Sequence, residues 1–297
     1  MSRSMPVIII FGAYGLLGSS LALALAREGY KIVRQSRRDE AELRLDLLDK
    51  SALTVALLEY KPEVVINLVG LTNVDQCEIK PQLAWKANTN AVKTLTESLV
   101  VVGEKLGRTP HLVHVSTDQV YDGPGPHSEE DIDLINVYAL SKYAGELFAE
   151  RVEATVLRTN FYGRSKCNGR VSFSDWLVHS LEERVPITVF DDVTFSAVHI
   201  DTLCSIIGKC IECRPVGIFN AGCRNSITKA EFAFQLARNL NLSTEEVTVG
   251  SSGDLALTAR RPLDMTLNVA RLEHALNMKC PDILSEIERT SKEYLND

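Results

Sequence analysis

The chain has 297 residues, and its formal net charge of -7 at pH 7 argues against a nucleic acid or an anionic membrane as a partner. No apolar run approaches the ~20 residues of a membrane helix, and the first five residues are too short for a signal peptide, so we expect a cytoplasmic protein. The hydrophobic content of 45% is ordinary for a globular protein, and the length allows one α/β domain with a smaller lobe.

A glycine-rich turn lies near the start of the chain. The apolar residues 7–11 predict a buried strand, and the Leu- and Ala-rich residues 19–27 predict a helix. Glycine lets a backbone approach phosphate closely, and a helix N-terminus attracts negative charge. The pattern therefore predicts a nucleotide pyrophosphate site rather than an ordinary tight turn. The candidate residues are Gly12, Tyr14, Gly15, Leu16, Leu17 and Gly18.

The next expected strand, at residues 30–34, is followed by Ser36, Arg37 and Arg38, with no acid before Asp39. In nucleotide-binding folds an acid at this point binds the ribose 2'-hydroxyl, whereas basic residues accommodate a 2'-phosphate. We therefore expect NADP, with NADPH preferred over NADH. The alternative interpretation is that these arginines are solvated loop charges.

Strand and helix patterns then alternate. Strands are expected from residue 43 and at 64–70 and 111–116, with helices at 51–60 and 81–103. This order predicts an α/β fold, a doubly wound parallel sheet (Rossmann) with a smaller C-terminal substrate-binding lobe. We expect the NADP-binding domain to comprise residues 1–163 and 188–221, and the lobe residues 164–187 and 222–297. In the second half, a strand is expected at 155–158, and helices at 172–184, 227–240 and 281–297.

The seven cysteines are scattered and do not resemble a disulfide framework. Cys210 and Cys213 have C-x-x-C spacing, which we interpret as part of a buried helix face in preference to a metal or redox pair. His199 is interpreted as a structural residue at a strand end. No metal site is expected.

Three residues form the candidate catalytic group. Thr117 follows the strand at 111–116, and Tyr138 and Lys142 are four residues apart on an expected helix, so their side chains share a face. An ammonium beside a tyrosine lowers the pKa of its hydroxyl, which prepares it to exchange a proton with a carbonyl oxygen while hydride moves to or from a nicotinamide. Thr117 would hold the same oxygen.

Several motifs in order give the chain a family resemblance. They are the glycine turn, Asn67, the segment from Thr72 to Glu78, Asn88, Ser116-Thr117-Asp118, Tyr138 with Lys142, Arg261-Pro262 with Asp264, and Leu267-Asn268. Over nearly its whole length the chain resembles an extended short-chain dehydrogenase/reductase, and within that group the dTDP-4-dehydrorhamnose reductase family.

The resemblance implies an NADPH-dependent reductase of the 4-keto group of a nucleotide-linked 6-deoxysugar, with Thr117, Tyr138 and Lys142 as the catalytic residues. It adds cofactor-binding residues to those of the glycine turn and the arginine segment: Asp46, Leu47, Val69, Gly70, Asn88, Tyr138 and Lys142. It implies these substrate-binding residues: Thr72, Val74, Asp75, Thr117, Asp118, Asn160, Phe161 and Arg261. Arg261 is expected to bind the diphosphate.

Two departures from the family pattern bear on the substrate. The segment Arg158–Gly163 is shortened and lacks a tryptophan that family members often carry, so the sugar-facing wall is expected to differ. Gln119 stands where sugar-nucleotide dehydratases carry a glutamate base, which disfavours a dehydratase.

Two alternatives stay open. The regulatory subunit of methionine adenosyltransferase also resembles this family and binds NADP without turnover, although the intact catalytic trio favours an enzyme. The second alternative is an epimerase, because the same three residues can act on the keto intermediate that an epimerase forms transiently. Dimers are common among such folds, but nothing in the sequence forces a homodimer.

Overall fold

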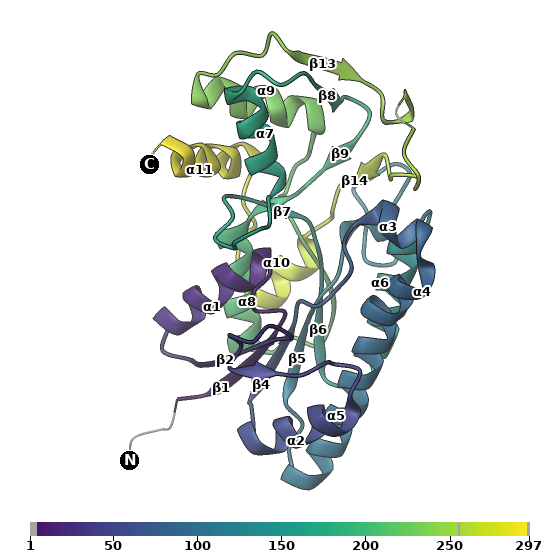
Figure 1. Ribbon diagram of the computed structural model, residues 1–297, viewed down its shortest axis with the longest axis vertical. Helices are drawn as coiled ribbons and strands as arrows, with labels where there is room; N and C mark the ends of the chain where they lie inside the picture. The colour runs from purple at the N-terminus through teal and green to yellow at the C-terminus, as the bar shows by residue number, and fades with distance from the viewer. Residues whose placement is uncertain (1–4, 255, 296–297) are drawn as a thin grey trace.

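The computed structural model describes residues 5–254 and 256–295, and within them a seven-stranded parallel sheet forms the centre of the molecule (Figure 1). Its strand order is β11-β6-β5-β4-β1-β2-β3. The strands are β1 (Val7–Phe11), β2 (Lys31–Ser36), β3 (Leu43–Arg44), β4 (Val64–Asn67), β5 (His111–Val115), β6 (Ala154–Thr159) and β11 (Gly217–Ala221). Every residue of β4, β5 and β6 is buried, as expected for strands covered on both faces.

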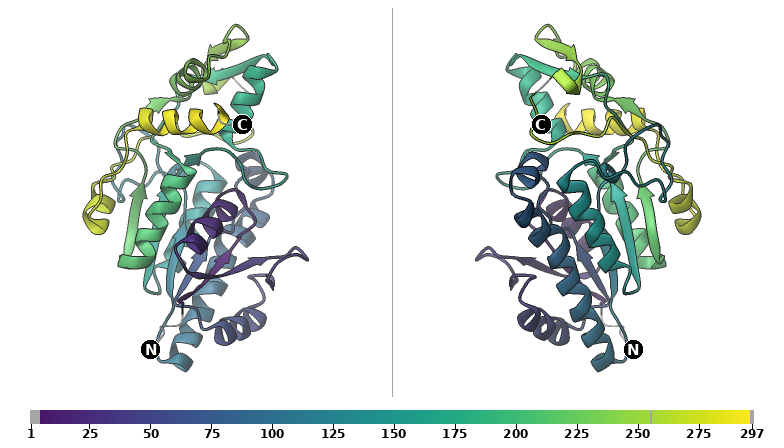
Figure 2. Two further views of the ribbon diagram at one scale, coloured as in Figure 1. Left: turned by 90° about the vertical axis from the view of Figure 1, so that its left-hand side faces the viewer. Right: turned by 90° about the vertical axis from the view of Figure 1, so that its right-hand side faces the viewer.

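Two layers of helices cover the sheet (Figure 2). One face carries α2 (Lys50–Tyr60), α5 (Ala91–Leu106) and α6 (Val137–Ala149). The other carries α1 (Leu16–Arg27), α8 (Ile200–Cys213) and α10 (Ala270–Leu276). This arrangement confirms the predicted doubly wound α/β fold.

The expected helix at 81–103 is interrupted. It consists of α4 (Pro81–Ala84), a π-helical turn η1 (Trp85–Asn90) and α5, and α3 (Val74–Ile79) precedes it. Such π-turns often occur at functional sites. Here η1 places Asn88 beside α6.

The remaining elements lie mainly beyond the carboxyl ends of the sheet strands, in the upper part of Figure 1. The helices and turns are η2 (Asp118–Val120), α7 (Phe173–Glu182), α9 (Lys229–Leu240), η3 (Ser252–Asp254) and α11 (Ile283–Leu295). The short strands are β7 (Phe161–Tyr162), β8 (Ile187–Phe190), β9 (Thr194–Phe195), β10 (Val198–His199), β12 (Ile227–Thr228), β13 (Val247–Gly250) and β14 (Asp264–Met265).

The division into an NADP-binding domain and a lobe stays a prediction. Strand β8 pairs with β13, and β9 pairs with β12 and β14. These pairings favour assigning residues 188–195 to the lobe instead of the nucleotide-binding part. In the part of the chain that the structure describes, no helix is both long and apolar enough to cross a membrane.

The glycine turn joins β1 to α1 with little space to spare. Gly12 has a φ of +81°, a conformation that favours glycine, and Gly15 N donates to Gly12 O at 3.0 Å. A Cβ at Gly18 would lie 2.7 Å from Ala13 Cα and closer still to Gly12 O. The turn and the first helical turn can therefore pack together only if residue 18 has no side chain.

A buried polar network lies beneath the carboxyl end of β5. The guanidinium of Arg158 donates to Glu146 Oε2 at 2.6 Å, and both side chains are almost completely buried. Arg158 also donates to the Tyr121 hydroxyl at 2.8 Å, and the Ser116 hydroxyl donates to Glu146. The network ties α6 to β5 and β6 directly below the cleft.

The glycine turn gives a stability prediction. Gly18→Ala should lower the free energy of unfolding by about 1–3 kcal/mol, because its methyl group overlaps the backbone of the turn. Gly253→Ala is the control, since its Cβ would meet only Ser251 Oγ at 3.6 Å. Urea unfolding measures the free energy of unfolding of both variants. Equal values for the two would show that a methyl group at residue 18 does not disturb the turn.

The buried ion pair gives a second prediction. Arg158→Met should lower the free energy of unfolding by about 3–5 kcal/mol, because the Glu146 carboxylate is left buried without its partner. Arg224→Met removes an exposed ion pair with Glu273 and should cost at most about 1 kcal/mol. A loss of similar size in the two variants would show that burial does not govern the effect.

Candidate active site

A cleft of about 1180 Å³ runs along the carboxyl ends of the sheet strands. This edge is where open α/β sheets bind their ligands. The predicted residues that line it are Gly12, Tyr14, Gly15, Leu16, Leu17, Gly18, Ser36, Arg37, Arg38, Asp46, Leu47, Val69, Gly70, Thr72, Thr117, Asp118, Tyr138, Lys142, Asn160 and Phe161. Asn88, Val74, Asp75 and Arg261 are not among its lining residues.

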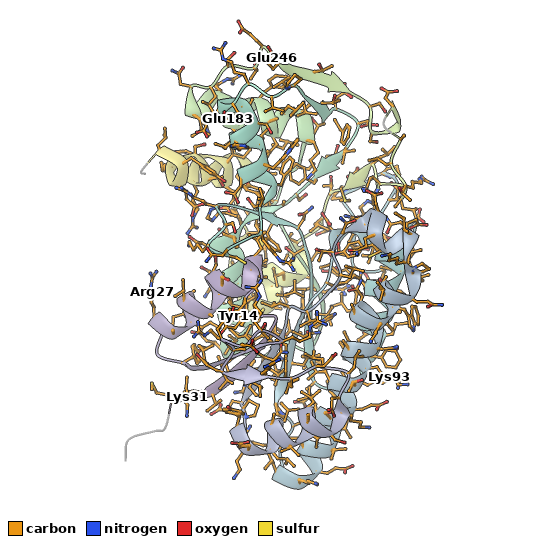
Figure 3. All side chains as sticks on the ribbon, viewed as in Figure 1. Tyr14, Arg27, Lys31, Lys93, Glu183 and Glu246 are labelled. Carbon is orange, nitrogen blue, oxygen red and sulfur yellow. The ribbon has the colours of Figure 1, made fainter. Side chains whose placement is uncertain are left out.

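The glycine turn is part of the lining of the cleft. Tyr14, labelled in Figure 3, lies in the turn just before α1. The buried side chain of Gln35 holds this turn, since its Oε1 accepts from Gly12 N at 3.2 Å and its Nε2 donates to Leu45 O at 2.7 Å. Sequence reasoning missed Gln35, because a glutamine within a strand gives no signal of its own.

The arginines after β2 differ in their partners. Arg34 donates to the Glu42 carboxylate at 2.8 Å, and Arg38 lies 3.8 Å from Glu40. Arg37 forms no ion pair with any described residue, and it lines the cleft. Of the three guanidinium groups, that of Arg37 is therefore the one left for an anionic ligand.

Helix α6 holds Tyr138 and Lys142 in the cleft, and both side chains are buried. Asn136 caps the helix by accepting from Ala139 N at 2.8 Å, which satisfies an N-terminal amide. Glu78 of α3 accepts from Val137 N at 3.0 Å. The segment from Thr72 to Glu78 thus helps to fix the start of the helix that carries Tyr138.

Burial lowers the pKa of Lys142 to about 8, although the nearby Glu146 acts in the opposite direction. Its Nζ donates to Val115 O at 2.7 Å. The lysine is thereby anchored at the end of β5, next to Thr117.

Burial raises the pKa of Tyr138 above its ordinary value, and a hydrogen bond with Thr117 partly opposes this shift. The lowering expected from Lys142 is not seen, and the Nζ of Lys142 donates to the backbone of β5. Tyr138 is therefore protonated at neutral pH. A protonated tyrosine in a cleft can donate a proton to an oxygen.

Asp118 follows Thr117 at the far end of the cleft, where burial raises its pKa to about 6. Asn160 Nδ2 donates to its Oδ2 at 2.9 Å, and the charge of Lys229 also favours the carboxylate. Sequence reasoning missed Lys229, which is far from Asp118 in the chain. The available signal was a lysine in the first turn of an expected helix, where cations are disfavoured.

Asn88 lies behind the cleft wall instead of in it. Its Oδ1 accepts from Leu71 N at 2.7 Å, and its Nδ2 donates to Ser141 Oγ at 2.9 Å. Asn88 thus joins the loop after β4 to helix α6. It affects the cleft indirectly, because it fixes the positions of this loop and this helix.

Arg261 and Asp75 bind each other. Arg261 donates to Asp75 Oδ2 at 2.7 Å, and Asp75 Oδ1 accepts from Ala259 N at 3.0 Å. The pair connects α3 to the segment before β14. The diphosphate role of Arg261 stays a prediction.

The cysteines are all free. On α8 Cys210 is buried as expected, whereas Cys213 is exposed. His199, Asp201 and Glu293 lie close enough to ligate a cation, but His199 Nδ1 accepts from Asp201 N and its Nε2 bonds to Glu293 at 2.9 Å. Lys166 also pairs with Asp201, so the protein's own groups satisfy this cluster.

Comparison with known proteins agrees with this geometry. Residues 5–296 match the family model described as the RmlD substrate binding domain. A probable low-salt glycan biosynthesis reductase of Haloferax volcanii is 27% identical, covering 96% of this chain and 98% of its own length. Methionine adenosyltransferase 2 subunit beta of Rattus norvegicus is 25% identical, covering 90% of this chain and 81% of its own length.

A solved structure shares the whole architecture. The dTDP-4-dehydrorhamnose reductase of Bacillus anthracis str. Ames, in complex with NADP, superposes with a TM-score of 0.86 at 26% identity. The match covers 98% of this chain and 100% of that one. The chain therefore belongs to the RmlD substrate binding domain family, whose members share the extended short-chain dehydrogenase/reductase fold.

Proposed function

We propose that this protein is an NADPH-dependent reductase of the 4-keto group of a nucleotide-linked 6-deoxysugar. The observation that carries the proposal is one continuous cleft that is lined both by a tight glycine turn and by Thr117, Tyr138 and Lys142. The reductases among its relatives support the same reaction class.

The residues present fit a dinucleotide. At Gly18 a Cβ would overlap the turn, which keeps the first amides of α1 close to the space where a pyrophosphate binds. Arg37 is free to bind a 2'-phosphate, and no acid lines the cleft at the end of β2. NADPH, when bound, supplies the hydride.

The chain's own residues supply the proton and hold the substrate oxygen. Tyr138, protonated at neutral pH, donates its proton to the C4 oxygen as negative charge develops there. Thr117 donates a hydrogen bond to the same oxygen. Lys142, a cation below a pH of about 8, donates to Val115 O behind them, and we assign it to holding the ribose of the nicotinamide.

Substrate binding is assigned to the residues around the far end of the cleft. We assign the sugar to Thr72, Asp118, Asn160 and Phe161, which line it. Val74, Asp75 and Arg261 lie outside this lining, and we assign them to the nucleotide and its diphosphate.

Tyr138→Phe tests the proton donor. Turnover of a 4-keto sugar nucleotide should fall about 100- to 10,000-fold, while NADPH binding is kept, because only the proton is lost. Tyr143→Phe, on the same helix and one turn further along, should keep normal turnover. Full turnover by Tyr138→Phe would contradict the mechanism.

Arg37→Ala tests the cofactor assignment. Its dissociation constant for NADPH should rise about 10- to 100-fold, with little change for NADH, because one charged hydrogen-bond donor to the 2'-phosphate is removed. Arg44→Ala is the matched control, since Arg44 pairs with Asp39 and does not line the cleft. An equal loss for the two cofactors would refute the role of Arg37.

The pH dependence tests Asp118. An ionised carboxylate accepts a stronger hydrogen bond from the sugar than a protonated carboxyl group does, and burial raises the pKa of Asp118 to about 6. The value of kcat/KM should therefore fall as the pH drops through about 6, and Asp118→Asn should abolish this fall. A profile that is unchanged in Asp118→Asn would assign the fall to another group.

A non-catalytic NADP-binding subunit is the second candidate, because methionine adenosyltransferase 2 subunit beta is also a relative. The two candidates predict different results for the purified protein. A reductase consumes NADPH with a keto sugar nucleotide alone, whereas a regulatory subunit changes the activity of a partner enzyme.

A further inference from the structure

Residues 164–171 form the β7–α7 loop, which the protein holds at both of its ends. Arg164 N donates to Glu293 Oε2 at 3.1 Å, which ties the start of the loop to α11. Ser165 N donates to the Asp175 carboxylate at 3.1 Å, and Asp175 belongs to the capping box of α7 at the other end of the loop. The loop is therefore fixed to two helices.

The middle of this loop lies against the glycine turn. The thiol of Cys167, which is buried, donates to Tyr14 O at 2.9 Å. Arg170 is three residues further along the chain, so its backbone lies at most about 11 Å from that of Cys167. Arg170 and Val171 both line the cleft, which the glycine turn also lines. The loop therefore carries Arg170 to the cleft beside the glycine turn.

The protein does not neutralise the charge of Arg170. Its side chain is exposed, and it forms no hydrogen bond or ion pair with any other residue that the structure describes. The carboxylates among the described lining residues are those of Asp46 and Asp118. Each already accepts a hydrogen bond, from Leu48 N at 3.1 Å and from Asn160 Nδ2 at 2.9 Å respectively. The guanidinium of Arg170 is therefore available to an anionic ligand in the cleft.

The start of α1 lacks the groups that commonly neutralise a helix N-terminus. Its N-cap residue, Gly15, has no side chain that could accept from the first amides, and the first turn holds no acid. A phosphate beside these amides would accept their hydrogen bonds and interact favourably with the helix dipole. A planar guanidinium binds phosphate oxygens in pairs. The amides of α1 and the side chain of Arg170 therefore suit the same anion.

We propose that Arg170 binds the pyrophosphate of the dinucleotide cofactor, together with the N-terminal amides of α1. This inference rests on the proposed function, because it concerns the cofactor of the same cleft. The role differs from that of Arg37, since the 2'-phosphate is present only in NADPH, whereas the pyrophosphate is common to NADPH and NADH. Loss of the Arg170 side chain should therefore weaken the binding of both cofactors by the same factor.

Calorimetric titration of the full chain with NADPH and with NADH tests the proposal. For Arg170→Met, the dissociation constants of both cofactors should rise about 10-fold, because one charged hydrogen-bond donor is removed in each complex. The difference from the wild type should shrink when NaCl is raised from about 0.05 M to about 0.5 M, since salt screens an exposed charge. A difference that does not change with salt would contradict a contact between charges.

Lys166→Met is the matched control on the same loop. Lys166 is also a cation, but it pairs with Asp201 at 3.3 Å and does not line the cleft. This variant should bind both cofactors as tightly as the wild type does. An equal loss of affinity in Lys166→Met would show a general effect of the charge of the loop and would overturn the assignment of Arg170.

The diphosphate of a nucleotide-linked substrate has the same chemistry as the pyrophosphate of the cofactor. The binding of dTDP to the protein saturated with NADPH separates these two sources. Arg170→Met should bind dTDP with the affinity of the wild type. A loss of affinity for dTDP, with unchanged affinity for both cofactors, would overturn the proposal and assign Arg170 to the substrate.

The outcomes also separate this inference from the proposed function. An Arg170→Met variant that binds NADPH and NADH as tightly as the wild type overturns the role of Arg170 and leaves the reductase proposal intact. A wild type that binds neither NADPH nor NADH overturns the cofactor assignment and the role of Arg170 together.

Discussion

The buried ion pair between Arg158 and Glu146 is the interaction on which the geometry of the cleft depends. Glu146 is one helical turn beyond Lys142, and Arg158 is on the neighbouring strand β6, so the pair fixes the rotation of α6 relative to the sheet. On the other side of the helix, Gly145 allows the backbone of Asn88 to approach closely, with Val92 Cγ2 3.3 Å from the position of a Cβ. Tyr138 and Lys142 face the cleft because α6 is held from both sides.

Burial then sets the charge states at the site. It raises the pKa values of Tyr138 and Asp118 and lowers those of Lys142 and Lys229, in each case because the charged form loses hydration. The consequence differs between groups. The tyrosine keeps its proton for donation, whereas the aspartate and the two lysines stay ionised near neutral pH.

Much of this arrangement could be predicted from the sequence, because it depends on local patterns. Continuous apolar runs identified β1, β4 and β5, the spacing of three glycines identified the turn before α1, and the four-residue spacing of Tyr138 and Lys142 placed them on one helix face. These elements position most of the predicted residues along the cleft.

The rest depends on contacts between distant parts of the chain. Gln35 holds the glycine turn, Asp75 binds Arg261, and the charge of Lys229 lowers the pKa of Asp118, and none of these pairings has a local signal. Strands of two residues, such as β9 and β12, are too short to show a period. The sequence also could not show that burial raises the pKa of Tyr138, where a lowering by Lys142 was expected.

The proposed reaction transfers a hydride from NADPH to C4 of a keto sugar nucleotide. The most direct measurement uses NADPH carrying deuterium at the transferred position, a dTDP-linked 4-keto-6-deoxysugar and magnetic resonance of the product. We expect one deuterium at C4 of the product for each NADPH consumed. A sugar that is interconverted without net loss of NADPH, or one that is not changed at all, would contradict it.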